Sequence, residues 1–216
     1  CVISIPYDMN EDVSGSYIKH IRKLTKENGI LLVLDEVWTG FRLALGGAQE
    51  YFGVDPDLAS YAKAMANGYP ISTYVGKRKY MSELNQFRMT TTYAGETLSM
   101  AAAIATISIM KREPVHKHLW AMGERLMQGF NQIAKDLGVE GSAAGLPPSS
   151  FLKFNTPDAA YNQRLEYLWF RELFREGIFV ILRWFISYSH KQTDIDLTLE
   201  KAKLALQRAL EAEPKE

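Results

Sequence analysis

Residues 29–36 have the sequence GILLVLDE, and residues 62–70 have the sequence AKAMANGYP. The five aliphatic residues after the first glycine do not alternate with polar ones, which is typical of a strand buried on both faces of a parallel sheet. Asp35 and Glu36 follow at the carboxyl end of this strand, where open α/β sheets bind ligands. Lys63 follows a second, short predicted strand. The pattern therefore predicts a carboxylate and a lysine at one edge of the sheet.

The neighbouring segments extend this into an alternating α/β pattern. Residues 1–36 are predicted to form strand, helix and strand, the arrangement of a parallel crossover. A helix at residues 98–110 is apolar almost all round, so we expect it to be buried. The elements predicted in this part are strands at residues 1–6, 30–34, 58–61 and 71–75 and helices at residues 18–28 and 98–110.

Pro114 marks a predicted domain boundary. Beyond it, apolar residues recur at helical spacing over residues 119–137. Residues 141–150 contain two glycines and two prolines and are predicted to be a loop. The remaining predicted elements are strands at residues 151–154 and 178–182 and helices at residues 165–173 and 199–210. The chain is thus predicted to have one domain at residues 1–113 and a smaller α+β domain at residues 114–216.

The composition is that of an ordinary globular protein. The 216 residues include 47% hydrophobic and 23% charged residues, and 25 basic residues balance 25 acidic ones. A neutral chain gives no electrostatic reason to expect nucleic acid or an anionic membrane as partner. The single cysteine, Cys1, excludes an internal disulfide framework and favours a cytoplasmic location. Because the chain begins within a predicted strand, we expect it to be the carboxyl-terminal part of a longer protein.

Lys63 is the first candidate for chemistry. It lies between two alanines and has few charged neighbours in the sequence. If it is buried, its pKa falls, and the neutral amine becomes a nucleophile that can form a Schiff base. The alternative is a surface lysine at the start of a helix.

Asp35 and Glu36 have several interpretations. One of them could bind a cationic or metal-bound ligand, or both could be a capping or salt-bridged pair. An apolar strand that ends in Asp-Glu is also typical of a Walker B strand, but that requires a phosphate-binding loop. The sequence lacks one, since Ile71 stands where the first glycine before Gly76 should be. The four histidines have no metal-ligand spacing, so no metal site is predicted.

Several of these motifs together resemble the class III (ornithine-type) pyridoxal-phosphate aminotransferases. They are DEVWTGFR at residues 35–42, GVDPD at 53–57, AKA at 62–64 and GYP at 68–70. The segment at 41–53 is most similar to the glutamate-1-semialdehyde 2,1-aminomutase branch, and TYAGETLS at 92–99 is similar to related transaminases. In the carboxyl-terminal part of the chain, ISYSH at 186–190 and DID at 194–196 resemble the family's last strand and helix.

The resemblance implies an α/β fold of fold-type I, like aspartate aminotransferase. Residues 1–113 would be the carboxyl-terminal half of the large cofactor-binding domain, and residues 114–216 the small α+β domain. The cofactor would be pyridoxal 5'-phosphate, and the active form a homodimer with shared active sites. The function implied is transamination between an amino donor and an aldehyde or keto acid. The alternatives are an intramolecular aminomutase and a non-catalytic domain that retains the fold.

The resemblance also assigns roles to individual residues. Lys63 would hold the cofactor as a Schiff base and then move the substrate's α-proton. Asp35 would pair with the pyridine nitrogen and keep it protonated, which makes the ring an electron sink. Val37 would pack on one face of the ring. Thr92 would reach the phosphate of the neighbouring subunit's cofactor.

The sequence also departs from the family pattern. Ile5-Pro6 replaces a Glu-Pro, and Glu96-Thr97 replaces an Asn-Pro. Trp38 stands where Gln or Met is usual, so we expect Trp38 and Tyr69 to contribute to the substrate pocket. The family's upstream half supplies the phosphate-binding turn and the aromatic residue that stacks on the cofactor. We therefore expect this chain alone to bind the cofactor weakly and to be inactive.

Overall fold

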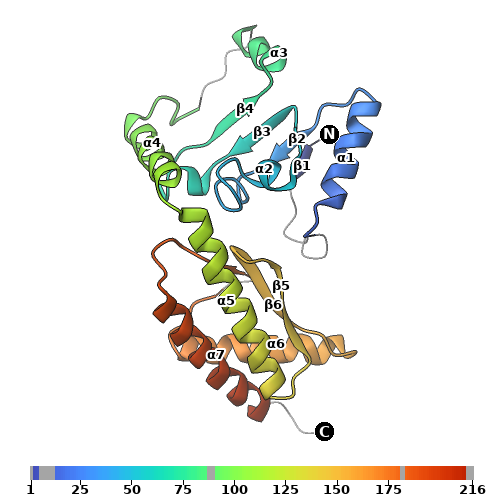
Figure 1. The fold of residues 1–216 in the computed structure, drawn as a ribbon, viewed down its shortest axis with the longest axis vertical. Coiled ribbons are helices and arrows are strands. Elements are labelled where there is room, and N and C mark those ends of the chain that lie inside the picture. The colour runs from blue at the N-terminus through green and yellow to red at the C-terminus, as the bar shows by residue number, and fades with distance from the viewer. Residues whose placement is uncertain (1, 5–12, 87–90, 181–182, 213–216) are drawn as a thin grey trace. The chain divides into compact units, whose positions relative to one another are not determined.

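The computed structural model describes residues 2–4, 13–86, 91–180 and 183–212, and it divides the chain into two compact units, Cys1–His116 and Lys117–Glu216. Figure 1 shows both units as ribbons. The first contains a mainly parallel sheet with helices, and the second packs helices on an antiparallel sheet. The end of the predicted strand at Ile5-Pro6 lies outside the described residues.

The first unit is built on a four-stranded sheet in the order β1-β2-β3-β4. β1, β2 and β3 are parallel, and β4 is antiparallel to β3. The elements of this unit are β1 (Val2–Ser4), α1 (Ser16–Glu27), β2 (Val33–Asp35), α2 (Ala48–Phe52), β3 (Leu58–Tyr61), the 3₁₀ turn η1 (Lys63–Met65), β4 (Thr73–Gly76), α3 (Arg78–Met81), the 3₁₀ turn η2 (Ser82–Gln86) and α4 (Thr97–Arg112).

The strand register brings the predicted site residues to one edge of this sheet. Leu34 pairs with Ala59 and Asp35 pairs with Ser60, because β2 and β3 run in parallel. Leu34 is fully buried and Ala59 nearly so, which fixes which faces of the two strands lie inward. Lys63 follows the end of β3 by two residues, so it emerges at the same edge as Asp35.

The second unit packs helices against a three-stranded antiparallel sheet in the order β5-β6-β7. Trp169 is fully buried, and its ring lies 5.3 Å from that of Phe130 and 5.8 Å from that of Phe154, so aromatic side chains dominate this core. The elements are α5 (Val115–Asp136), which spans the boundary between the units, β5 (Gly141–Leu146), β6 (Ser149–Phe154), α6 (Ala159–Arg175), β7 (Trp184–Phe185) and α7 (Gln192–Ala212).

The predicted loop at residues 141–150 was wrong. Residues 141–146 form β5, which pairs along its whole length with β6, and Pro147 and Pro148 make the turn between them. Gly123 on α5 allows this turn to approach closely, because a Cβ there would lie 2.0 Å from the carbonyl oxygen of Pro147. Glycine and alanine have weak strand preferences, and here the pairing with β6 overrides them.

Other boundaries also differ from the prediction. The strand at residues 58–61 is confirmed, but residues 30–32 precede β2 rather than belonging to it. Residues 178–180 are not in a strand, while residues 181–182 lie outside the described part of the chain. The short strand β7 instead follows at Trp184, where hydrogen-bonded pairing with β6 is available.

The helix predicted at residues 98–110 is present as α4, but the expectation that it is buried was wrong for this chain. Leu98 is 60% exposed and Ile104 is 68% exposed. Ser99 and Ala103 are buried, so one side of the helix does pack within the first unit. None of the helices in the described residues has the length and apolar character needed to cross a membrane.

Candidate active site

Asp35 is held in place at the end of β2 by two hydrogen bonds. Its Oδ1 accepts from the amide of Val37 at 3.0 Å and from the hydroxyl of Ser60 at 3.3 Å. Both donors bond to the same oxygen. Among the described residues, Oδ2 accepts no hydrogen bond and is available for a further donor. A half-buried carboxylate with one committed and one open oxygen suits a ligand that carries a protonated nitrogen.

Lys63 is exposed at the start of η1, as in the surface-lysine alternative, and Asp35 lies near enough for its charge to act on the amine. Partial loss of hydration still lowers the pKa of its amine, and the negative charge of Asp35 opposes this shift. The two side chains form no ion pair in the described part of the chain. A lysine with a lowered pKa has more of the neutral, nucleophilic form at neutral pH.

Trp38 contacts Lys63 directly. The Nζ atom of Lys63 lies 3.7 Å from the centroid of the Trp38 ring, which is the geometry of a cation–π contact. Trp38 is 42% exposed, so the indole stands at the surface of this edge rather than in the core.

Glu36, the neighbour of Asp35, has a structural role. It is fully buried, and its carboxylate accepts hydrogen bonds from the hydroxyl of Thr39 and from the amides of Ala48 at 2.9 Å and Gln49 at 2.8 Å. Burial raises the pKa of this carboxyl, and these hydrogen bonds partly offset the rise. Glu36 therefore caps α2 and closes the loop between β2 and α2.

The loop from residue 37 to residue 47 is packed tightly on this carboxylate. Gly47 has φ +82°, and a Cβ there would lie 2.6 Å from Oε2 of Glu36, so only glycine fits. The hydroxyl of Tyr61 donates to the carbonyl oxygen of Gly46 at 3.0 Å and accepts from the side chain of Gln49. Burial and the charge of Glu36 raise the pKa of Tyr61 to about 12, so this hydroxyl stays protonated.

Three residues other than glycine have positive φ in the described part of the chain: Phe41 at +59°, Lys63 at +44° and Asn67 at +49°. All three lie in the loops that follow the carboxyl ends of β2 and β3. Left-handed backbone is costly for residues with a Cβ, and such strain is concentrated at functional sites. The distribution is therefore consistent with a site at this edge.

The other predicted site residues are placed less closely together. Val37 is half-buried and its amide fixes Asp35. Tyr69 is 47% exposed in the turn that follows η1. Thr92 is exposed in a turn before α4, and among the described residues it has no hydrogen bond to Asp35 or Lys63.

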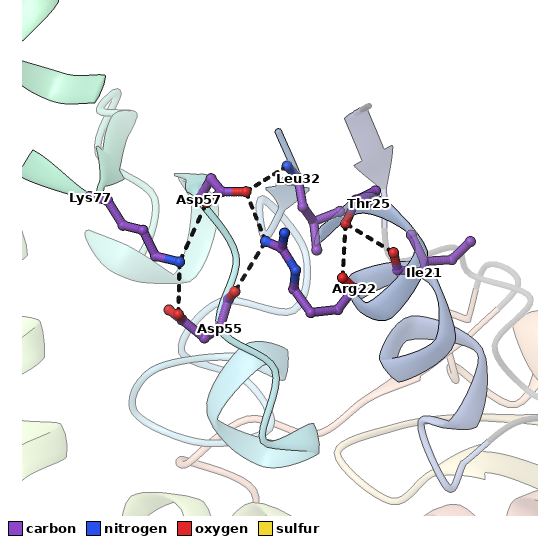
Figure 2. A network of polar contacts seen from close by, with 7 residues as sticks. All are labelled: Ile21, Arg22, Thr25, Leu32, Asp55, Asp57 and Lys77. Atoms are coloured by element: carbon purple, nitrogen blue, oxygen red, sulfur yellow. Dashed lines mark hydrogen bonds and ion pairs between the residues drawn. The ribbon is translucent and has the colours of Figure 1, made fainter. Parts of the chain in front are cut away.

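A second polar cluster, drawn in Figure 2, lies at the amino ends of the same strands, because Leu32 and Asp57 directly precede β2 and β3. Asp57, just before β3, accepts from the amide of Leu32 at 3.0 Å and from Arg22 at 2.8 Å, and Lys77 lies 3.4 Å away. Lys77 also pairs with Asp55 at 2.8 Å. Burial alone would raise the pKa of Asp57, but these partners outweigh it and lower the pKa to about 2.

Two contributions to the site were missed from the sequence. Ser60 could have been found by aligning β2 and β3 in parallel, since it stands directly opposite Asp35. The separation of roles between Asp35 and Glu36 follows from strand alternation, which points neighbouring side chains to opposite faces. In the part of the chain that the structure covers, no group of three His, Cys, Asp or Glu side chains could hold a metal ion.

The fold and this edge define an α/β protein of the fold-type I transferase class. A solved structure with a TM-score of 0.83 is the FumI protein of Sphingopyxis sp. MTA144 in its PLP internal aldimine form, which is 30% identical and is matched over 90% of this chain and 47% of its own. An omega-transaminase from Sphaerobacter thermophilus, also with a TM-score of 0.83 but 22% identical, supports the fold; the match covers 90% of this chain and 48% of that one.

The chain belongs to the class-III aminotransferase family, whose model matches residues 11–145. A glutamate-1-semialdehyde 2,1-aminomutase of Methanosarcina acetivorans is 36% identical to it. That match covers 85% of this chain and 46% of the relative. A 3-aminobutyryl-CoA aminotransferase of Cloacimonas acidaminovorans is 32% identical to this chain. That match covers 88% of this chain and 47% of the relative. The chain therefore spans about half the length of the curated relatives it matches.

Proposed function

We propose that the protein containing this chain is a pyridoxal-phosphate-dependent aminotransferase, acting on a small-molecule amino donor and an aldehyde or keto acid. The observation that carries this proposal is the parallel register of β2 and β3, which puts Asp35 and Lys63 at one edge without pairing them. Membership in the class-III family and the similarity to FumI support it.

The residues at this edge fit the cofactor chemically. Lys63 is the group that holds the cofactor covalently through Nζ, since its lowered pKa favours the nucleophilic amine. The open oxygen of Asp35 accepts a hydrogen bond from the protonated pyridine nitrogen, and Val37 offers an apolar side chain beside it. Bound pyridoxal phosphate supplies an electron sink for the substrate's α-carbon.

Lys63 then has a second role as an acid and base. Once the amino donor displaces it, its free amine takes the proton from the substrate's α-carbon and returns it at a neighbouring atom. Asp35 stays hydrogen-bonded to the pyridine nitrogen and keeps that nitrogen protonated. Trp38 and Tyr69, both partly exposed at or near this edge, are proposed to line the substrate pocket.

A visible absorption band tests the covalent role of Lys63. The protein at its natural length should develop the band on addition of pyridoxal phosphate, and Lys63→Ala should abolish it. Lys77→Ala is the matched control, because Lys77 lies at the other end of the strands, and it should retain the band. A band of equal strength in Lys63→Ala would refute the proposal. We expect the isolated 216-residue chain to bind the cofactor weakly, because relatives are about twice as long.

The alternative function is an intramolecular aminomutase of the glutamate-1-semialdehyde type, which the similarity to the Methanosarcina acetivorans relative favours. The two functions use the same residues but differ in their products. With an amino donor alone, an aminotransferase releases a free keto acid or aldehyde and leaves the amino group on the cofactor. An aminomutase instead returns the rearranged amine. Product analysis after a single turnover separates the two.

We also propose a cytoplasmic homodimer in which Thr92 of one subunit binds the cofactor phosphate of the other. The exposed turn that carries Thr92 supports this. Co-expression of Thr92→Ala with Lys63→Ala provides the test. If Thr92 acts across the interface, the mixed dimer contains one intact site and regains activity that neither variant has alone. If Thr92 acts within its own subunit, no intact site forms and activity is not regained.

The division of the chain into two compact units suggests its domains. We propose that residues 1–113 belong to the large cofactor-binding domain and residues 114–216 form the small domain. The two compact units, which meet between His116 and Lys117, support a boundary close to Pro114. Limited proteolysis of the natural-length protein should cut near this boundary before it cuts within either unit.

A further inference from the structure

We propose that Trp38 is a positioning residue that holds the Lys63 amine on its ring and so keeps it from pairing with Asp35 before the cofactor binds. Since the proposed function makes Lys63 the attachment point of the cofactor and Asp35 the partner of its ring, the two must stay apart to be available. A lysine and an aspartate at one sheet edge would otherwise tend to pair with each other.

The contact between the ring and the amine is the first support. The Nζ atom lies 3.7 Å from the ring centroid, and the face of an indole attracts an ammonium group more strongly than other aromatic faces do. Lysine has a flexible four-carbon stem, so an unheld Lys63 would sample many positions. The ring selects one of them at the carboxyl edge.

The rigidity of the Trp38 backbone is the second support. Val37, which precedes it, donates its amide to Asp35, and Thr39, which follows it, donates its hydroxyl to Glu36. The amide of Gly40 donates to the carbonyl oxygen of Glu36 at 2.7 Å. Trp38 is therefore presented by a turn that is fixed on both sides to buried or half-buried carboxylate residues.

The backbone of Lys63 is the third support. Its φ of +44° lies in the left-handed region, and the amide of Ala66 donates to its carbonyl oxygen at 3.4 Å at the end of η1. The direction of the Lys63 side chain is thus constrained at its base as well as at its tip. Asp35 is the charged group that acts on the amine, and it does so without an ion pair.

The reactivity of Lys63 in the cofactor-free protein tests this role. The protein at its natural length is labelled with acetic anhydride across a range of pH, and the peptide containing Lys63 is quantified by mass spectrometry. Trp38→Leu keeps an apolar side chain but removes the π face. In an Asp35→Asn background, no carboxylate can replace the ring as a partner of the ammonium group. Loss of the cation–π contact should then speed labelling of Lys63 by about 2- to 5-fold at pH values below the midpoint of its titration.

With Asp35 present, the same substitution should have a smaller effect. The freed ammonium can now pair with Asp35, which stabilises the charged form, so the acceleration should be at least about twofold smaller than in the Asp35→Asn background. Trp38→Phe retains a ring and should fall between the native protein and Trp38→Leu. Tyr167→Leu removes an exposed aromatic side chain on α6 and should leave Lys63 labelling unchanged.

Two results would overturn the inference. No acceleration in the Asp35→Asn background would mean that the ring does not hold the ammonium. Equal acceleration in both backgrounds would mean that Trp38 does not keep the amine off Asp35. Because labelling needs no cofactor, these results are independent of the visible band: a protein that shows the predicted labelling but no band retains the Trp38 contact and loses the proposed function.

Discussion

The two ends of the β2–β3 strand pair carry the same kinds of side chain in different states. At the amino end, Asp57 accepts from a backbone amide and an arginine and lies beside a lysine, and its pKa falls to about 2. At the carboxyl end, one oxygen of Asp35 has no donor among the described residues, and Asp35 does not pair with Lys63. Polar groups that satisfy one another stabilise the fold, whereas groups that are left available can bind and react.

The largest expected effect is on activity at the carboxyl end of the strand pair, which holds Asp35 and Lys63 and is called the open end below. Asp35→Asn should keep the hydrogen bonds from Val37 and Ser60 but lose the negative charge, so the pyridine nitrogen is no longer held protonated. We expect turnover of the natural-length protein to fall by about 100- to 1000-fold. The free energy of unfolding, measured in denaturant, should change by less than about 0.5 kcal/mol. A large loss of stability would mean that Asp35 belongs with Asp57 as a structural carboxylate.

The next effect concerns the support beneath the open end. Glu36→Ala leaves the amides of Ala48 and Gln49 and the hydroxyl of Thr39 without their acceptor. We expect it to cost about 2–4 kcal/mol in unfolding free energy. Glu36→Gln keeps one side-chain oxygen as acceptor and should cost less. If both substitutions were neutral, the loop between β2 and α2 would not depend on this carboxylate.

The structure explains which parts of this comparison the sequence could supply. The aliphatic run before Asp35 was enough to predict a parallel strand, although only Val33 and Leu34 of the run belong to it and Ile30 and Leu31 are exposed. The roles of Lys63 and Asp35 as partners of one cofactor stay predictions. The ring contact of Trp38 could not be predicted, because it depends on a loop whose shape is set by Glu36 and Gly47. Likewise, β5 depends on pairing with β6, and local composition does not report such pairing.

The exposure of α4 marks another limit of sequence reasoning. Its composition predicts burial, yet Leu98 and Ile104 are largely exposed in this chain. An apolar helix shows that a surface needs a partner, but it does not show which segment or subunit provides it. The roles proposed for Val37, Tyr69 and Thr92 likewise depend on groups outside this chain, and they remain predictions.

A smaller effect is expected at the amino end of the strand pair, called the closed end because Asp57 is paired there with Arg22 and Lys77. Asp57→Asn removes the negative charge that faces Arg22 and Lys77 but keeps an oxygen that can accept from Leu32. We expect it to lower the free energy of unfolding by about 1–3 kcal/mol. Turnover per folded molecule should be unchanged, since the cluster is distant along the strands from Lys63. Loss of turnover without loss of stability would reverse the assignment of the two ends.

The smallest effect is the dependence of stability on acid. The partners of Asp57 lower its folded-state pKa from its ordinary value of 3.8 to about 2. Its contribution to stability is therefore present above the unfolded value and is lost as the pH falls through about 2. With allowance for solvent screening, this contribution is about 1–2 kcal/mol. Comparing denaturant unfolding of the native protein and Asp57→Asn between about pH 5 and pH 2 isolates it. Parallel curves would contradict the low pKa.

The attachment site of the cofactor tests the central claim most directly. The natural-length protein is incubated with pyridoxal phosphate, reduced with borohydride, digested, and analysed by peptide mass spectrometry. We predict that the reduced cofactor is attached to Lys63, at the open end of the strands. Attachment to Lys77, at the closed end, or to no lysine of this chain, would contradict the account.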